Sequence, residues 1–431
     1  MTVDPARSSR LRDAKTSFSA QKDLFESVAV LGGYSALSFG FLFLFHFLMA
    51  RYLGPTEYSV IGTFMSVLIT AIYISGSFYF ILTRFVTYHH SRSQFEEINY
   101  LVTHGLKYFF AAGFLIFLIF LVCSQQIALF FKLDDIKPVV ALGFAIWLQL
   151  LVPVYEAAFK GLEDMHSMGR MRVVENGSRW VIGMLLAYLA FGLTAMVFAL
   201  GLGTFVALSS TYVGIRTLQS RQMVKPNMQE IWSYAIPAFI VTASVAILLN
   251  LDLILVKHYF PPGEAGIYAA ASFVAKIPFL ISWTIATILF PRVTKLHVDG
   301  LPTSHLLRRS LKWMVIIVIG SAFVNMFFAN AIFRGLFGPE YSFGRYLGVY
   351  SFAMGLLAIV NILSVYQLAR KRFTLAWIIP WFTLLQFVLL LLFHDSLFAV
   401  VTVTILVASL LVATTIIVLR DELNLERLFA E

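Results

Sequence analysis

Long apolar stretches, separated by short polar segments, run along almost the whole chain. About 20 mainly apolar residues, rising 1.5 Å each, cross a hydrocarbon core of ~30 Å as one helix. Cutting the sequence at charges, glycines and prolines predicts about twelve such spans, with the weakest boundary at the uncharged turn Phe191–Thr194. The predicted spans are residues 24–50, 58–83, 107–130, 137–159, 178–192, 194–215, 232–257, 265–290, 311–334, 344–369, 373–393 and 396–419. We therefore expect an all-α integral membrane protein.

The composition agrees with this pattern. Of the 431 residues, 59% are hydrophobic and 13% are charged, whereas about a quarter of a soluble domain is charged. The single cysteine, Cys123, excludes a disulfide framework and a cysteine metal site. The first apolar stretch begins near Leu24, which is too late for a cleaved signal peptide, so we expect it to be retained as the first span.

Lysine and arginine lie mainly on one side of the predicted topology. With an even number of spans both termini share a side, and that side holds 25 of the 32 basic residues against six on the other. The positive-inside rule assigns the basic side to the cytoplasm. We therefore expect a multi-pass protein of the cell (plasma or inner) membrane with both termini cytoplasmic. The net charge of +9 reflects topology and needs no nucleic acid partner.

Two segments that lie 207 residues apart are similar. RYLGPTEYSV (Arg51–Val60) joins the first two predicted spans, and HYFPPGEAGI (His258–Ile267) joins the seventh and eighth. The offset equals six spans, so the halves are predicted to be parallel repeats, which in membrane proteins often enclose a pathway at their interface. We expect an N-terminal lobe of residues 1–222 and a C-terminal lobe of residues 223–431. Two ordinary Pro/Gly turns are the alternative interpretation.

A lysine lies near the middle of the eighth predicted span. In GIYAAASFVAKIPFLI (Gly266–Ile281), Lys276 is roughly 16 Å of helix from the outer end. Its side chain can reach only about 6 Å towards a headgroup layer, so it should face water, an acid or a bound anion. Pro278 should loosen the helix beside it. Two interpretations remain open, a cation that lines a central cavity or a structural ion pair with Asp252.

Polar residues in neighbouring spans are candidates for the same substrate cavity. Asp252 could pair with Lys276 or bind a coupling ion, and Asn250 offers a neutral polar group close by. Arg84, at the cytoplasmic end of the second span, is either an interfacial anchor or a phosphate contact, because its planar fork can donate two bonds to an anion.

Three further residues are candidates for gating or ion coupling. Arg51, at the outer end of the first span, is an anchor or part of an outer gate and is also counted among the cavity candidates. Glu156 and Lys160 lie four residues apart on one helical face, which favours a helix-surface ion pair. The same two residues could instead take part in coupling or gating.

Motifs for other chemistries are absent from the sequence. There is no GxxxxGK[ST] loop, so ATP is not expected to drive the protein directly. There is no HExxH motif and no cluster with metal-ligand spacing, so we predict neither a metal site nor catalytic residues. Asp134 and Asp135 are adjacent carboxylates in a short loop between lysines, which a solvated turn explains better than acid–base catalysis.

Four segments carry a resemblance to a known family. They are similar to the oligosaccharide (polysaccharide-unit) flippases of the multidrug/oligosaccharidyl-lipid/polysaccharide exporter (MOP) superfamily. The segments are ARYLGPTEYSVIGTF, LDLILVKHYFPPGEAGIYAAASFVAKI with the later ATILFPRVTK, TRFVTYHH, and FKGLEDMHSMGRMRVVENGSRW. The resemblance covers nearly the whole chain in order and spacing, although the third and the last three spans carry little of it.

The resemblance implies a V-shaped pair of six-helix lobes around a basic central cavity that opens alternately to each side. It implies a flippase that moves a polyprenyl-pyrophosphate-linked oligosaccharide to the outer leaflet, without making or breaking a bond, so no enzyme is expected. Lys276, Arg84 and Asp252 match positions where the family has charged residues. No cofactor is expected, although Na⁺ or H⁺ could act as a coupling ion. Membrane lipids and other glycan-assembly proteins are the expected partners.

Three alternatives stay open at the level of sequence. An ion-coupled drug or small-molecule exporter of the same superfamily would favour acids in its cavity, where Lys276 places a cation. A membrane glycan polymerase or ligase would carry a sizeable external loop with catalytic residues, and the predicted external loops are short. A scaffold for glycan assembly would leave no distinctive residue pattern.

Overall fold

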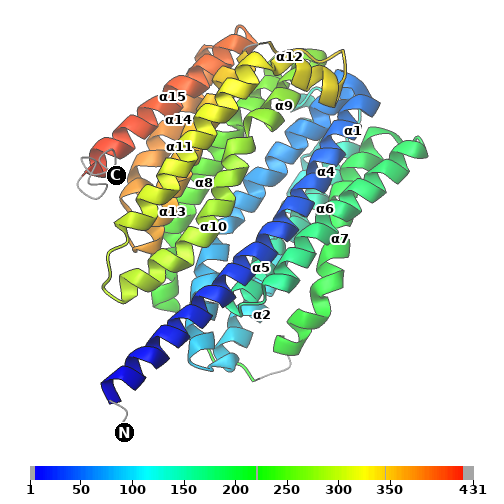
Figure 1. The fold of residues 1–431 in the computed structure, drawn as a ribbon. Coiled ribbons are helices and arrows are strands. Elements are labelled where there is room, and N and C mark those ends of the chain that lie inside the picture. Colours follow the sequence, from blue (N-terminus) through cyan, green and yellow to red (C-terminus); the bar gives the residue numbers. More distant parts are fainter. Residues whose placement is uncertain (1–4, 220–221, 345, 421–431) are drawn as a thin grey trace.

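The computed structural model describes residues 5–219, 222–344 and 346–420, and within these ranges it contains helices and no strand. Figure 1 shows the helices as one tilted bundle. In chain order they are α1 (Pro5–Ser91), α2 (Phe95–Val122), α3 (Ser124–Phe130), α4 (Lys137–Gln149), α5 (Val152–Gly161), α6 (Met165–Tyr188), α7 (Gly192–Gln219), α8 (Met228–Tyr259), α9 (Pro262–Ala275), α10 (Ile277–Val298), α11 (Ser304–Phe327), α12 (Ala329–Ile332), the π-helical turn η1 (Phe333–Phe337), α13 (Tyr346–Ala369), α14 (Thr374–Leu392) and α15 (Leu397–Val418).

Helix α1 contains the first two predicted spans. The backbone leaves helical geometry at Gly54 (φ 68°, ψ 174°), and Pro55 follows. Glycine adopts this positive φ without steric cost, whereas other residues rarely do. We call residues 5–53 the first arm of α1 and residues 55–91 its second arm. The end of the bundle that carries Gly54 is called the outer end, and the opposite end is called the inner end.

The predicted number of spans is confirmed. Within the described ranges, ten helical stretches are long and apolar enough to cross a membrane, and one of them, Val30–Ser91, contains both arms of α1. Helix α6 is not among the ten because it carries several charged side chains, yet it packs between α1 and α7 as the predicted fifth span. The two arms of α1 and the addition of α6 bring the spans to twelve.

Several predicted boundaries are wrong because helices continue beyond their apolar stretch. The predicted loops 84–106, 160–177 and 291–310 contain the ends of α1, α2, α6, α10 and α11. The predicted fifth span, 178–192, begins at Met165, and the predicted ninth span, 311–334, is α11, which runs from Ser304 to Phe327. Charged residues end the hydropathy signal, but they do not end backbone hydrogen bonding once a helix reaches the headgroup layer.

An uncharged turn separates the predicted fifth and sixth spans, but it lies at residues 189–191 and not within Phe191–Thr194 as predicted. Helix α6 ends at Tyr188 and α7 begins at Gly192. Ala190 (φ 55°) and Gly192 (φ 75°) take positive φ angles, which reverse the chain within a few residues.

The twelve spans form two lobes. Figure 1 shows α8 to α15 gathered on one side and α2 to α7 on the other, with α1 running between them. Helix α7 ends at Gln219 and α8 begins at Met228, so the predicted division after residue 222 falls between these two helices. The second arm of α1 packs against α8 and α9 of the other lobe.

The two similar segments meet at the outer end of the lobe interface. A Cβ atom built on Gly266 would lie 1.8 Å from the carbonyl oxygen of Pro55, and one built on Gly62 would lie 2.6 Å from the Cβ of Ala269. Gly62 and Ala269 are separated by 207 residues, which is the offset of the repeat. Equivalent positions of the two lobes therefore touch, as expected close to a pseudo-two-fold axis along the membrane normal.

Candidate functional site

Lys276 lies at the break between α9 and α10. Helix α10 begins at Ile277 with Pro278 in its first turn, where the missing backbone donor of proline is tolerated. The Nζ atom of Lys276 donates to Asn250 Oδ1 at 2.9 Å and lies 3.5 Å from Ser66 Oγ. Ser66 belongs to α1, so the lysine is buried between the lobes, with 6% of its surface exposed.

Asp252 makes hydrogen bonds with tyrosines, and the predicted ion pair with Lys276 is not formed. Its fully buried carboxylate accepts hydrogen bonds from Tyr268 (2.8 Å), from Tyr350 and from the backbone N–H of Leu253 (2.8 Å). The ion pairs formed among the described residues include neither Asp252 nor Lys276. The ion-pair interpretation of Lys276 is therefore wrong, because hydroxyls satisfy the acid and an amide oxygen satisfies the ammonium group.

Glu156 pairs with Arg172, and the predicted ion pair between Glu156 and Lys160 is wrong. Arg172 donates from Nε at 2.5 Å and from Nη2 at 3.0 Å to the two carboxylate oxygens, a bidentate geometry. The sequence placed Arg172 in a loop, but it lies within α6. The pair is mostly buried, and it joins α5 to α6 inside the N-terminal lobe.

Lys160 bridges the two lobes in the inner half of the membrane. Its Nζ atom donates to the hydroxyl of Tyr79 at 3.0 Å and to the backbone carbonyl of Thr287 at 2.8 Å. Thr287 lies on α10 in the C-terminal lobe, whereas Lys160 lies on α5 in the N-terminal lobe.

A third lysine is buried, although its sequence position did not single it out. Lys257, which the predicted topology places at an outer helix end, is 2% exposed and donates to Ser59 Oγ at 2.8 Å. A lysine at the end of an apolar span is usually an interfacial anchor. The only signal in the sequence was its place directly before the repeated segment His258–Ile267.

The three lysines follow the second arm of α1, and we call Lys257, Lys276 and Lys160 the lysine series. Their hydroxyl partners on this arm are Ser59, Ser66 and Tyr79. From the first partner to the last is about 30 Å of helix, which equals the thickness of the hydrocarbon core. Throughout the described chain, no carboxylate pairs with any of the three. Buried cations without acids are costly in a membrane, so their presence favours a functional role.

Arg84 lies at the inner end of the interface, far from Lys276. It is 18 residues beyond Ser66 on α1, which is about 27 Å of helix. Its guanidinium lies 5.4 Å from the ring centroid of Tyr234, which belongs to the other lobe. The buried Nη1 atom has no hydrogen-bond partner among the described residues. One diphosphate therefore could not contact Arg84 and Lys276 together.

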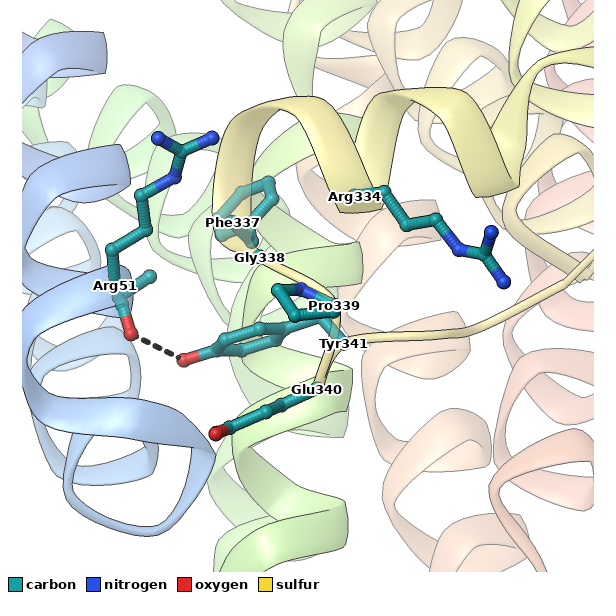
Figure 2. A pocket seen from close by; sticks show the side chains of 8 residues that line it. Arg51, Arg334, Phe337, Gly338, Pro339, Glu340 and Tyr341 are labelled. Atoms are coloured by element: carbon teal, nitrogen blue, oxygen red, sulfur yellow. Dashed lines mark hydrogen bonds between the residues drawn. The ribbon is translucent and has the colours of Figure 1, made fainter.

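Arg51 lies at the outer end, where it helps to close the lobe interface. Its guanidinium donates to the carbonyl of Gly335 at η1. The hydroxyl of Tyr341 donates to the carbonyl of Ala50 at 2.9 Å, the bond drawn as a dashed line in Figure 2. Arg51, Ala50 and Tyr341 line an open pocket of about 440 Å³, together with Arg334 and Glu340 among others. Arg51 thus contacts the loop after α11 and not the middle of the interface.

A polar network inside the N-terminal lobe was also missed. Arg179 donates to Glu175 at 2.6 Å, to Gln149 at 2.5 Å and to Thr204 at 2.8 Å. These residues join α6 to α4 and α7, and the side chains satisfy one another, as a buried network requires. The i, i+4 spacing of Glu175 and Arg179 was a signal, but Glu175 lies outside the apolar stretch and was therefore predicted to lie in a loop.

The outer carboxylates Asp134 and Asp135 lie in the turn between α3 and α4. Asp135 accepts the backbone N–H of Lys137 at 3.0 Å and pairs with its ammonium group at 3.2 Å. The backbone bond from Lys137, followed by its side chain, holds the pKa of Asp135 below the usual value. Within the residues that the structure describes, no three His, Cys, Asp or Glu side chains form a group that could hold a metal ion.

Comparison with known proteins identifies a family and a fold. The profile of a family described as polysaccharide biosynthesis protein matches residues 48–343. No curated protein sequence matches the chain.

Solved structures share its architecture at low sequence identity. An inward-facing multidrug resistance MATE family transporter of the MOP superfamily is 13% identical, with a TM-score of 0.73 over 91% of this chain and 96% of that one. An outward-facing multidrug resistance MATE family transporter is also 13% identical, with a TM-score of 0.69 over 92% of this chain and 95% of that one. The lipid II flippase MurJ, in an inward closed conformation, is 15% identical, with a TM-score of 0.67 over 90% of this chain and 87% of that one.

These likenesses agree with the two-lobed arrangement in Figure 1. The family match spans more than half of the chain and includes the second arm of α1 and all of the lysine series. The resemblance inferred from the sequence is thus confirmed. The chain belongs to the polysaccharide biosynthesis protein family, and it is a multi-pass membrane protein with the twelve-helix fold of MOP superfamily transporters.

Proposed function

We propose that the protein is a flippase that carries a polyprenyl-pyrophosphate-linked oligosaccharide from the cytoplasmic to the outer leaflet by alternating access. The observation that carries this proposal is the lysine series. Three buried ammonium groups line one lobe interface through the membrane, and each is held by neutral oxygens that an anion can replace. A pathway for a drug cation would favour buried acids instead.

The lysines suit a cargo that carries its charge in one compact group. Taking a diphosphate out of water is expensive unless cations and hydrogen-bond donors replace its hydration. Lys276, midway through the membrane, offers such a cation, and Lys160 and Lys257 offer equivalents on either side. The apolar tail of the cargo would stay in the bilayer, so that only the diphosphate and the sugars pass between the lobes.

The same lysines give the cargo a way to open the interface. Lys160 joins the lobes on the inner side through the carbonyl of Thr287, and Lys257 joins them on the outer side through Ser59. A diphosphate oxygen that accepts a hydrogen bond from Lys160 competes with the Thr287 carbonyl. The phosphate oxygen is negatively charged and the carbonyl is neutral, so the ammonium group of Lys160 binds the phosphate more strongly. Binding of the cargo would thus release one inter-lobe bond at a time.

Arg84 is the first contact that we assign to the cargo. Its position at the inner end and its unpartnered Nη1 atom leave a donor available to a phosphate. Tyr234 holds the guanidinium plane from the opposite lobe. This order of contacts assumes that the inner end faces the cytoplasm, as the positive-inside rule predicts.

The test measures transport by Lys276 variants in proteoliposomes loaded with a lipid-linked oligosaccharide. Lys276→Ala should slow transport by about ten-fold or more, because one charge-assisted contact contributes about 1.5–3 kcal/mol. Lys276→Arg keeps the charge and should retain part of the rate. Lys137→Ala is the matched control, since this lysine lies exposed at the outer end, with 74% of its side chain accessible.

Three results would contradict the proposal. Full activity of both Lys276 variants would remove the role of the buried cation. Transport of a drug-like cation without transport of the lipid-linked sugar would favour a small-molecule exporter. If the wild-type protein does not transport the lipid-linked sugar, it is not a flippase for this cargo.

A further inference from the structure

An apolar groove runs along the C-terminal lobe between α10 and α11. It has a volume of about 500 Å³, within the range of small-molecule sites. The groove is open along its length, and its walls are mostly isoleucines and leucines, with two arginines and a tryptophan. The lining residues are Ile281, Ile285, Ile288, Leu289, Arg292, Leu306, Arg309, Ser310, Trp313 and Ile317.

The groove lies on the face of α10 that points away from the lobe interface. Ile281, Ile285, Ile288 and Arg292 recur at three- and four-residue spacing, so they share one face of the helix. Thr287, which accepts the bond from Lys160, lies on the opposite face of α10. The groove is therefore separate from the lysine series.

The length of the groove matches one leaflet. Ile281 and Arg292 are eleven residues apart, which is about 16 Å of helix, or half of a ~30 Å hydrocarbon core. Arg292 lies 16 residues beyond Lys276, about 24 Å of helix from the middle of the membrane. On a tilted helix this places the guanidinium in the inner headgroup layer.

Two arginines mark the inner end of the groove. Arg292 and Arg309 line it from α10 and α11, and both side chains are exposed. Neither forms an ion pair within the described ranges. Guanidinium groups donate to phosphate bidentately, and basic pockets between transmembrane helices on the cytoplasmic side typically bind anionic lipid headgroups.

We propose that this groove is a binding site for one anionic phospholipid of the inner leaflet. Arg292 and Arg309 hold the headgroup phosphate, and one acyl chain lies along the isoleucine wall towards Ile281, with Trp313 at its side. The groove is as long as one leaflet is thick and ends about 8 Å of helix before the level of Lys276, which fits an acyl chain and not a polyprenyl chain. The proposal does not depend on the cargo of the transporter.

The test is native mass spectrometry of the full-length protein titrated with phosphatidylglycerol or with phosphatidylcholine of the same acyl chains. Wild-type protein should retain phosphatidylglycerol about thirty-fold better, the preference expected from two basic contacts with an anionic lipid. Arg292→Gln/Arg309→Gln should lower its retention to the level of phosphatidylcholine. Arg308→Gln/Lys312→Gln is the matched control, because it removes the same charge from α11 outside the groove.

A second variant tests the apolar wall with both arginines in place. Ile285→Trp fills the middle of the groove and should release phosphatidylglycerol without changing the headgroup contacts. If the arginine variant does not fold, Ile285→Trp still tests whether the lipid binds in this groove. Melting temperatures of all variants check that the protein remains intact.

Four results would overturn the proposal. Equal loss of phosphatidylglycerol in the control and in the arginine variant would mean that the charge acts non-specifically. Unchanged retention by Ile285→Trp would exclude the groove as the binding place. Displacement by inorganic phosphate alone would point to a free anion site. Stronger retention of a polyprenyl monophosphate, lost in the same variants, would assign the groove to the cargo.

Discussion

Replacing Gly266 by alanine would make the new methyl group overlap with the carbonyl oxygen of Pro55. The new Cβ atom would lie 1.8 Å from that oxygen, whereas ordinary contact begins at 3.4 Å. The obstacle is backbone, which cannot rotate away, so α9 and the turn of α1 would have to separate by more than 1 Å. Overpacking of this kind costs about 1–3 kcal/mol, against a gain of up to about 1 kcal/mol in helix propensity. We therefore expect Gly266→Ala to lose about 1–2 kcal/mol of stability.

Gly263→Ala is a matched control on the same helix. Its new Cβ atom would lie 4.0 Å from the Thr56 hydroxyl, so this variant should be as stable as the wild type or slightly more stable. The assay compares melting temperatures of the three proteins in detergent, followed by the distance between spin labels on the outer ends of the two lobes. If Gly266→Ala melts at the wild-type temperature with unchanged distances, the two lobes do not touch there and the inferred contact is wrong.

Two further predictions concern buried carboxylates. Glu156→Gln should lower stability by about 3 kcal/mol, because it leaves Arg172 without its partner, while the double variant with Arg172→Gln should recover much of the loss; equal melting temperatures of the single and double variants would contradict the pairing. If Asp252 carries the coupling proton, Asp252→Asn should make transport independent of an imposed proton gradient, whereas Tyr350→Phe, which removes only one hydrogen bond to it, should keep the dependence. An Asp252→Asn protein that still responds to the gradient, or a wild type that responds only to Na⁺, would exclude this role.

The sequence allowed the membrane topology to be predicted because hydropathy depends on composition alone. Lys276 was found for the same reason, since a charge in the middle of an apolar span needs no structure to be noticed. Arg172 and Glu175 were missed because their charges broke the apolar pattern, so the start of α6 was assigned to a loop. Helix α6 nevertheless continues across these charges, since its neighbours supply their partners.

The partners of the buried lysines could not be predicted from the sequence. The spans are apolar all round, so no periodicity indicates which face of a helix meets the other lobe. Lys160 was expected to reach Glu156, four residues away, yet it reaches Thr287, which is 127 residues away in sequence. Contacts of that separation depend on how the lobes pack, and neither spacing nor propensity encodes them.

The close approach of Gly266 to Pro55 makes the two openings of the interface mechanically unequal. From Gly266 to the inner end of α10 is about 48 Å of helix, so a rotation of about 10° about this contact would move the inner ends apart by about 8 Å. The contact between Gly266 and Pro55 would stay closed during that rotation, because it is the pivot. Opening the outer end by the same angle requires Gly266 and Pro55 to separate. Gly266→Ala should therefore shift the balance towards the outward-open form, at the expense of the inward-open form.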